Sequence, residues 1–421
     1  MKKNRYRKTE EPQKTVKPLF SLIGITFFIL LGTWAWGAFT EDPLTMDLPL
    51  ASDQEPIRFQ DFRPELSHLE NGKYVTHLEN GMTATYTLDA NMQTRVKNYF
   101  QRYKVPYGSF VAMSPKTGEI LALVDYSARE PEARDISLRA TYPAASLFKV
   151  ITAAAAVEEK QLSPDISIAY RGKVNRLKPA YWQDNPKKDR LKMSLAAAFA
   201  KSNNVVFAKI ANRWLDVPTL LNYGERFYFN RQIPFENPVE ISRMEINQTA
   251  GELENTAAGF GKVDISPLHA ALITSAIANN GIMMTPCMVN VVTNRAGEKL
   301  HGCTPKVLNK PISADTAAVL REMMAETVKR GTVQHVFHRR SRGQSIREIS
   351  IGGKTGSLRG KNPEGRYSWF VAMAPLENPE IVVAAMVVND PVWHITAPQV
   401  AREGLSAYFE GSSSKGDGLT R

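Results

Sequence analysis

The sequence predicts an α+β protein in which an antiparallel β-sheet is flanked by helices and contains an inserted helical subdomain, preceded by one transmembrane helix. The pattern between residues 143 and 276 is mainly helical. Apolar, strand-like segments lie on both sides of that block, at 109–115, 119–127, 349–357, 369–376 and 381–389. Strands from distant parts of a chain that share one antiparallel sheet are typical of an α+β domain.

The N-terminal region predicts a membrane anchor. Residues 2–17 contain seven Lys or Arg against two Glu, and residues 18–39 form an uncharged, apolar stretch of 22. A helix that spans a bilayer needs about 20 such residues. Basic residues favour the cytoplasmic side. We therefore expect a cytoplasmic tail at 1–17, a transmembrane anchor at 18–39, and the remainder of the chain outside the cytoplasm.

The rest of the chain divides into a short connector and one large domain. Residues 40–83 predict a juxtamembrane stalk, ending in a candidate hairpin that turns at Asn80 and Gly81. An amphipathic helix is expected at 90–103, and the folded domain covers 84–410. Further helices are expected near 313–328 and 396–409, and 411–421 is expected to be a flexible tail.

Composition excludes several classes of function. The formal net charge is +11, but the tail at 2–17 supplies +5 of it, and no basic stripe is interleaved with aromatic residues. We therefore expect no nucleic-acid partner. Two cysteines and seven histidines show no metal-ligand spacing; His335 and His338 are three apart but lack a partner. No metal and no cofactor are expected.

A first chemical motif is Ser146-Leu-Phe-Lys149, an S-x-x-K. Pro143 suits an early helical position, and the helix continues as an almost wholly apolar run. On such a helix Lys149 lies one turn after Ser146 on the same face. A neutral lysine can then remove the serine proton. The alternative is an exposed turn with a solvated lysine. A second S-x-x-K, at 412–415, lies in the expected tail.

A second motif is Ser202-Asn203-Asn204, which separates two helical segments. The Ser202 hydroxyl could relay a proton, and the Asn204 amide could hold a substrate carbonyl. Locally, a helix break with Ser and Asn capping the next helix explains the same residues equally well.

A third motif is Lys354-Thr355-Gly356-Ser357, within a strand that begins with two further glycines. Glycine inside a strand often marks close approach of a ligand or another backbone. Thr355 and Ser357 point to the same side and could bind a carboxylate beside Lys354. An earlier Lys-Thr-Gly, at Lys116, lies between two apolar strands, where a turn explains it fully.

The order and spacing of the three motifs resemble those of the transpeptidase domain of penicillin-binding proteins. The resemblance includes TYTLDANMQ and PKTGEILALVDYS before the nucleophile, GFGKVDISPLHAALITSAIANNG and KRGTVQHVF between the second and third motifs, and SWFVAMAP after the third. It covers about residues 84 to 410. It implies a peptidoglycan D,D-transpeptidase that is inhibited by β-lactams, with peptidoglycan stem peptides as substrates.

The resemblance also implies a role for each motif residue. Ser146 would attack the penultimate D-Ala carbonyl, with Lys149 as base and Ser202 as proton relay. The backbone N–H groups of Ser146 and Ser357 would form the oxyanion hole. The residues implied in substrate binding are Asn204, Lys354, Thr355, Gly356 and Ser357.

The resemblance leaves some alternatives open. A D,D-carboxypeptidase would release the same acyl-enzyme to water. A β-lactamase or β-lactam sensor, and a non-catalytic cell-wall scaffold, are further alternatives. No large pedestal domain is expected between the membrane and the transpeptidase domain. Other cell-wall synthesis proteins are candidate partners, but the resemblance does not indicate which surface they would bind. The basic loop 358–366 beside the third motif predicts a mobile rim.

The two cysteines flank a candidate hairpin. Segments 288–293 and 298–302 would pair around a turn at 294–297, which places Cys287 and Cys303 opposite or nearly opposite each other. Opposed residues of an antiparallel pair lie within the distance that a disulfide allows. An extracytoplasmic location favours the bond. The alternative is a pair of reduced thiols.

Overall fold

A computed structural model describes residues 67–78, 81–337, 346 and 348–416. The predicted tail 1–17 and transmembrane anchor 18–39 lie outside these residues. Among the helices that the structure describes, none is both long and apolar enough to cross a bilayer.

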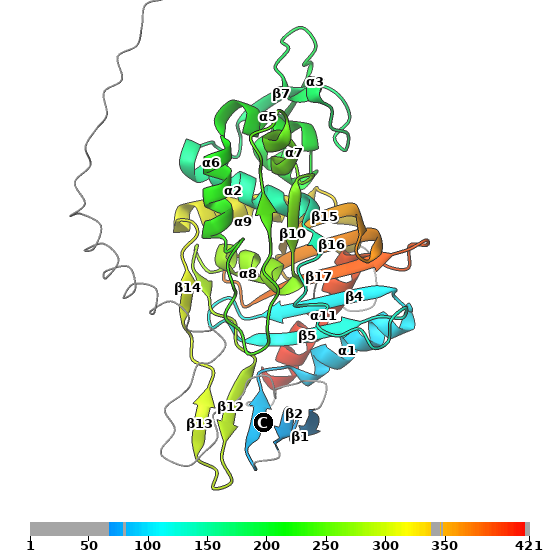
Figure 1. Ribbon diagram of the computed structural model, residues 1–421, viewed down its shortest axis with the longest axis vertical. Helices are drawn as coiled ribbons and strands as arrows, with labels where there is room; N and C mark the ends of the chain where they lie inside the picture. The colour runs from blue at the N-terminus through cyan, green and yellow to red at the C-terminus, as the bar shows by residue number, and fades with distance from the viewer. Residues whose placement is uncertain (1–66, 79–80, 338–345, 347, 417–421) are drawn as a thin grey trace, which may run out of the picture. The chain divides into compact units, whose positions relative to one another are not determined.

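A five-stranded antiparallel sheet forms the centre of the domain, in the order β15-β16-β17-β4-β5 (Figure 1). Its strands are β4 (Tyr107–Met113), β5 (Ile120–Tyr126), β15 (Gly352–Lys361), β16 (Glu364–Ala374) and β17 (Ile381–Asn389). Strand β17 pairs with β4, so the two ends of the domain meet in one sheet, as the sequence predicts. Every residue of β17 is buried, because β17 is central and both faces of the sheet are covered.

Helices cover the two faces of this central sheet. On one face, α1 (Ala90–Arg102) and α11 (Ala397–Gly416) pack against side chains such as Phe110 and Phe370. The predicted apolar face of α1 is confirmed, since Met92, Val96 and Phe100 are its buried residues. On the other face lies α8 (Pro267–Ala278), every residue of which is buried.

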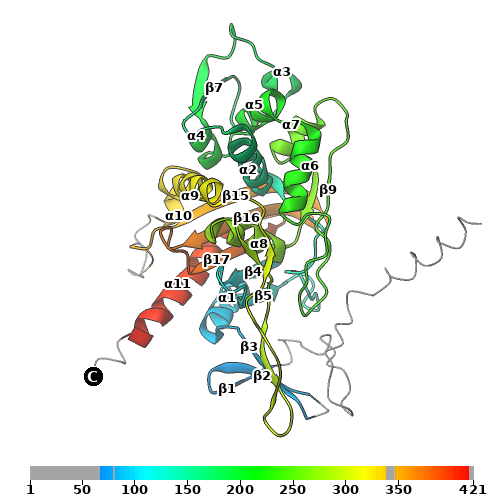
Figure 2. The ribbon, with the colours of Figure 1, turned by 90° about the vertical axis from the view of Figure 1, so that its left-hand side faces the viewer.

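The inserted helical subdomain lies beside the edge strand β15 (Figure 2). Its helices are the 3₁₀ helix η3 (Ala145–Phe148), α2 (Lys149–Lys160), α3 (Pro179–Trp182), α4 (Leu195–Ala200), α5 (Asn204–Trp214), α6 (Val217–Arg226) and α7 (Glu252–Ala257). Short strands join them: β6 (Tyr142–Pro143), β7 (Ser167–Tyr170), β8 (Leu191–Ser194), β9 (Met244–Glu245) and β10 (Lys262–Ile265). The chain then returns through α8, β11 (Met283–Met284), β14 (Val307–Asn309), α9 (Ala314–Lys329) and α10 (Gln334–Phe337).

A second five-stranded sheet, which we call the N-terminal sheet, has the order β1-β2-β3-β12-β13. Its strands are β1 (His68–Glu70), β2 (Lys73–His77), β3 (Thr83–Tyr86), β12 (Val289–Thr293) and β13 (Lys299–Gly302). The predicted hairpin at 74–88 is confirmed by the pairing of β2 with β3. The stalk assignment is corrected for 68–73, because these residues form β1 and the start of β2, in a sheet completed by a segment from after α8.

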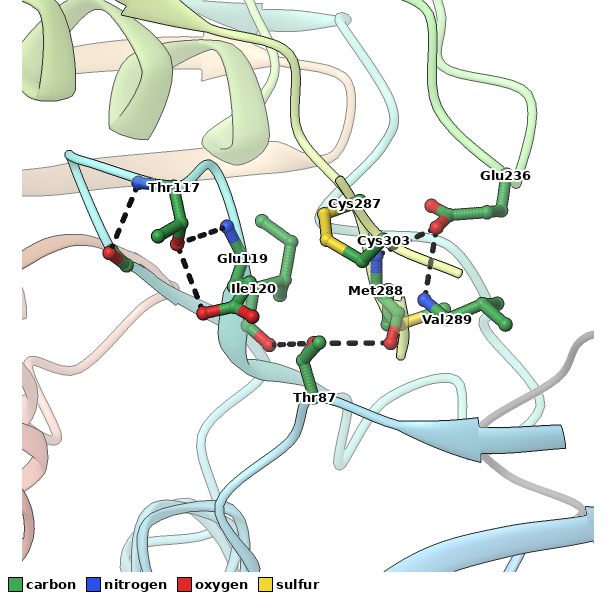
Figure 3. The surroundings of a disulfide bond; sticks show 10 residues. Thr87, Thr117, Glu119, Ile120, Glu236, Cys287, Met288, Val289 and Cys303 are labelled. Atoms are coloured by element: carbon green, nitrogen blue, oxygen red, sulfur yellow. Dashed lines mark hydrogen bonds between the residues drawn. A yellow bond between two sulfur atoms is a disulfide. The ribbon is translucent and has the colours of Figure 1, made fainter. Parts of the chain in front are cut away.

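The predicted bond between Cys287 and Cys303 is present (Figure 3). The hairpin pairs Val292 with His301, about three residues out of the predicted register, so the cysteines lie just beyond its ladder. Their Cα atoms are 5.9 Å apart. The bonded segment also contacts the central sheet, because the Ile120 N–H donates to the Cys287 carbonyl at 2.8 Å. The disulfide therefore lies where the two sheets meet.

Three local expectations are corrected. The predicted rim loop 358–366 is a β-hairpin, because β15 and β16 stay paired out to Lys361 and Glu364. Pro143 belongs to β6, paired with Asp264, rather than to the first turn of a helix. Helix α11 continues to Gly416, past the predicted start of the tail.

Candidate active site

The three sequence motifs meet between η3, the junction of α4 with α5, and strand β15. The Lys149 Nζ atom lies 2.8 Å from the Ser146 hydroxyl and 2.8 Å from Asn204 Oδ1. The Lys354 Nζ atom donates to the Ser202 hydroxyl at 3.0 Å. Residues from three distant stretches of sequence therefore form one cluster, as the spacing predicts.

The main chain around Ser146 is held in an unusual conformation. Ala145 has φ +49°, in the left-handed region that residues with a Cβ adopt rarely. Gly259 packs against this turn, and a Cβ there would lie 2.4 Å from the Ala145 carbonyl oxygen. Just before the turn, the Trp369 indole N–H donates to the Pro143 carbonyl at 3.0 Å. Constraints of this kind fix the position of Ser146.

Lys149 is the first residue of α2 and is fully buried. Its Nζ has a third partner in the Ala258 carbonyl, and it lies 5.7 Å from the centre of the Phe207 ring. Burial lowers the pKa of Lys149 well below its usual value, and the nearby charge of Lys354 lowers it further. The exposed, solvated lysine that the motif alone allowed is therefore contradicted.

The second motif caps the next helix, as one of the two sequence interpretations predicts, and its Asn204 and Ser202 side chains also contact the two lysines. The Asn203 side chain accepts from the N–H groups of Val205 and Val206 and so caps α5. Ser202 has φ +54°, which ends the preceding turn and turns its hydroxyl to Lys354. Asn204 is buried, with its Oδ1 bound to Lys149, so in this structure its amide oxygen holds the lysine.

Strand β15 supplies the third motif and forms the edge of the central sheet that faces η3. Lys354 is fully buried, and burial lowers its pKa to about 7. Its neighbours alternate as in any strand: Thr355 is half-buried and Ser357 is exposed. Gly356 is where β15 approaches η3, since a Cβ there would lie 3.3 Å from the Ala144 carbonyl. The predicted reason for a glycine in this strand is thus confirmed.

Several residues of the site were not singled out from the sequence. The Thr332 hydroxyl bonds the Thr355 hydroxyl at 2.8 Å, and the Ala258 carbonyl binds Lys149. The rings of Phe199 and Phe207 lie close to the two lysine ammonium groups. Thr332 falls inside a segment that carried the family resemblance, and Ala258 directly precedes another, so the resemblance pointed to their regions without assigning a role to either.

The earlier Lys-Thr-Gly lies away from this cluster. Lys116 is exposed and donates to Asn378, and Gly118 has φ +85° in a tight turn between β4 and β5. The turn predicted from the sequence is confirmed.

The expectation that no histidines group together is wrong for the described residues. His68, Glu70 and His77 offer three possible metal-ligand atoms that lie within 4.8 Å of one another, on β1 and β2. They belong to the N-terminal sheet, whereas Ser146, Lys149, Ser202 and Lys354 lie on other elements of the domain.

A family model described as the penicillin binding protein transpeptidase domain matches residues 108–403, more than half of the chain. The chain belongs to this family. All three motifs of the cluster fall within the matched residues, so the arrangement described above is that of a penicillin-binding transpeptidase domain.

Two curated proteins are similar in sequence to this chain. The chain is 28% identical over 316 residues to peptidoglycan D,D-transpeptidase PbpA of Mycobacterium tuberculosis, an alignment that covers 67% of this chain and 62% of the relative. It is 25% identical over 332 residues to stage V sporulation protein D of Bacillus subtilis, covering 72% and 49%. The chain thus spans less than two thirds of the length of these curated relatives.

Solved structures share the fold. A ceftriaxone acyl-enzyme complex of penicillin-binding protein A from M. tuberculosis has a TM-score of 0.64 at 25% identity, covering 78% of this chain and 80% of that one. A transpeptidase domain from Eggerthella lenta has a TM-score of 0.65 at 23% identity, covering 81% and 96%.

Proposed function

We propose that this protein is a peptidoglycan D,D-transpeptidase that works through an acyl-enzyme on Ser146 and is inhibited by β-lactams. One observation carries the proposal: the Ser146 hydroxyl lies 2.8 Å from a fully buried lysine whose pKa is lowered well below its usual value. A serine needs an adjacent base to become a nucleophile, and a neutral lysine is such a base. The acyl-enzyme complex of the M. tuberculosis relative supports the same chemistry.

The first half-reaction forms the acyl-enzyme. Lys149 takes the hydroxyl proton while Ser146 Oγ attacks the penultimate D-Ala carbonyl of a stem peptide. The tetrahedral intermediate collapses, the amide C–N bond breaks, and the leaving terminal D-Ala amine receives a proton. Ser202 relays to this amine the proton that Lys149 took from Ser146, which leaves Lys149 neutral again for the second half-reaction. The Ser202 hydroxyl lies against the ammonium of Lys354. A serine ester of the shortened peptide remains.

The second half-reaction transfers the acyl group. The amine of a neighbouring stem peptide attacks the ester and loses a proton to Lys149. The ester C–O bond breaks, Ser146 regains its proton, and a cross-link between two peptides results. Water in place of the amine would give the carboxypeptidase reaction with the same residues.

Residues of β15 bind the substrate. Lys354 is a cation on this strand, and Thr355 and Ser357, two residues apart on one side of it, offer hydroxyl groups that suit the terminal carboxylate. Since β15 is the edge strand facing η3, alternate N–H groups along it have no neighbouring strand. The N–H groups of Ser146 and Ser357 form the oxyanion hole. Asn204 holds a substrate amide with the part of its side chain not bound to Lys149.

The proposal includes a location. Residues 18–39 anchor the chain in the cytoplasmic membrane, residues 1–17 lie in the cytoplasm, and the domain acts on the cell-wall side. The net-basic tail and the uncharged stretch of 22 residues support this placement. The disulfide supports it too, because such bonds persist outside the cytoplasm.

Labelling with a fluorescent penicillin, followed by proteolysis and mass spectrometry, tests the acyl-enzyme. We expect one adduct per chain, on Ser146, that is released slowly. Ser146→Ala abolishes labelling. An adduct on Ser202 instead, or rapid loss of the label by hydrolysis, would contradict the proposal.

Product analysis on a stem-peptide donor and acceptor tests the second half-reaction. We expect cross-linked dimer as the main product. If trimmed monomer is the only product, the acyl-enzyme mechanism still holds, but the protein is a carboxypeptidase.

A further inference from the structure

The outer edge of the N-terminal sheet brings together three side chains that the sequence keeps apart. Strands β1 and β2 are antiparallel, with His68 opposite Val75 and Glu70 opposite Lys73. In this register the odd positions of β2 share a face with the even positions of β1, so His77 joins His68 and Glu70. The Glu70 Oε1 atom lies 2.6 Å from His68 Nε2 and 2.9 Å from His77 Nε2.

These three atoms form a donor set suited to a transition metal. Two imidazole nitrogens and one carboxylate oxygen are the protein ligands of many zinc sites in which solvent occupies the remaining position. Around a tetrahedral ion with bonds of about 2.0 Å, the donor atoms lie about 3.3 Å apart. The three atoms already lie within 4.8 Å of one another, and all three side chains are about half exposed and free to adjust. Small rotations of the side chains would therefore bring all three to bonding distance.

A neighbouring hydroxyl orients one of the ligands. The His77 Nδ1 atom lies 3.1 Å from Thr83 Oγ1 on β3. Nε2 of the same ring donates to Glu70 in this structure; when an ion replaces that proton, Nδ1 donates to the Thr83 oxygen and Nε2 presents its lone pair to the ion. Metal-binding histidines almost always have such a partner on the second nitrogen, because it fixes both the tautomer and the ring orientation.

We propose that His68, Glu70 and His77 bind one divalent transition-metal ion of the zinc class, with water completing the coordination. The site lies on β1, the edge strand of the N-terminal sheet, which has only three residues, all exposed. A bound ion links β1 to β2 through side chains, where three residue pairs otherwise hold them. The ion is structural, and the proposal does not depend on the transpeptidase chemistry.

Zinc titration by calorimetry tests the site. The full chain is purified with a tag that contains no histidine and is stripped of metal before Zn²⁺ is added. We expect one ion per chain. Co²⁺ in its place should give the intense visible absorption of a four-coordinate site with nitrogen and oxygen ligands.

Four variants and one control decide where the ion binds. His68→Ala, His77→Ala and Glu70→Gln should each raise the dissociation constant at least about tenfold, and Thr83→Val about tenfold, through loss of ring orientation alone. His335→Ala removes an exposed histidine on α10 and should leave the constant unchanged. Circular dichroism melting of each metal-free variant checks that the fold is retained.

Two results would overturn the site. One is wild-type protein that binds no more Zn²⁺ than a His68→Ala/His77→Ala double variant. The other is a His68→Ala or His77→Ala variant that binds Zn²⁺ with the same dissociation constant as the His335→Ala control. In both cases the three side chains form a hydrogen-bonded group only.

Discussion

The tripeptide Lys-Thr-Gly occurs twice in this chain, and the two copies lie in opposite environments. Lys116 is exposed at a turn, whereas Lys354 is fully buried beside Ser202. Gly118 has φ +85°, which the turn requires, whereas Gly356 is extended and lets β15 approach η3. The same three residues therefore form a tight turn in one place and a buried strand segment beside Ser202 and η3 in the other.

The difference follows from the flanking residues. The first copy lies between two strands that pair with each other, so the chain must reverse there. The second copy follows two glycines and continues into a strand whose one neighbour is β16. A short motif thus predicts chemistry only when its neighbours place it at an exposed edge facing other polar groups.

The largest effect is expected from the lysine that pairs with the nucleophile. Lys149→Arg keeps a positive charge, but a guanidinium stays protonated and cannot accept the Ser146 proton. We expect acylation by penicillin to slow by at least about 10³-fold, the upper range of a general base. Stopped-flow or gel-based labelling rates measure this. A rate close to wild type would mean that burial of a cation, rather than its basicity, matters at this position.

The next effect compares the two copies directly. Lys354→Ala removes a buried cation that bonds Ser202 and should slow acylation by about 10²-fold or more, since truncating a buried charge partner costs 2–5 kcal/mol. Lys116→Ala, the matched control, removes an exposed hydrogen bond to Asn378 and should leave the rate within about threefold. Reversed effects would show that the active strand has been assigned wrongly.

A pH profile tests the buried lysine of the second Lys-Thr-Gly copy. Burial lowers the pKa of Lys354 to about 7, so in the free enzyme its charge is lost as the pH rises through that value. The second-order acylation rate by an anionic β-lactam should therefore fall about tenfold per pH unit above it. Lys149 must be neutral, so its titration gives the rising limb, which burial and the Lys354 charge shift to lower pH.

Lys354→Arg is the control for the pH profile. A guanidinium keeps its charge throughout the range, so the falling limb should disappear even if the rate is lower. A wild-type profile that stays flat well above neutrality would contradict the assignment of this limb to Lys354.

The smallest effects are expected from alanine substitutions of the glycines in the two Lys-Thr-Gly copies. A Cβ on Gly118 would meet the Thr285 carbonyl oxygen at 2.1 Å and adopt a positive φ, so Gly118→Ala should destabilise the fold by about 1–3 kcal/mol. Gly356→Ala meets its neighbours at 3.2 Å or more and should change stability less. Instead it should push β15 from η3 and slow acylation several-fold. Urea unfolding and labelling rates measure the two effects. Equal losses of stability in Gly118→Ala and Gly356→Ala would contradict the different roles assigned to the two glycines.

Much of the fold was predictable because its patterns are local. The apolar face of α1 and the strands β4, β5, β16 and β17 follow from spacing and composition alone. The rim loop 358–366 was predicted wrongly because glycine, proline and charge are typical of loops, whereas here an edge hairpin extends into solvent. The reversal it needs is only two residues long, at Asn362 and Pro363.

The site was predictable from motif order, and its supporting residues were not. Ser146, Lys149, Ser202 and Lys354 occur in patterns that name their chemistry. Gly259 and the Ala258 carbonyl act through their backbone, so their residue types reveal nothing of their contact with the nucleophile turn. The histidines of β1 and β2 were missed for a related reason: strand pairing, rather than spacing along the chain, brings them together.

The three partners of Lys149 differ in one chemical respect. Asn204 Oδ1 and the Ala258 carbonyl can only accept hydrogen bonds, whereas the Ser146 hydroxyl can also donate one. A neutral amine has two N–H bonds and one lone pair. The two pure acceptors take both N–H bonds, so the lone pair must face Ser146. Loss of one proton from the amine therefore turns a donor to the serine into an acceptor from it, with no movement of the heavy atoms.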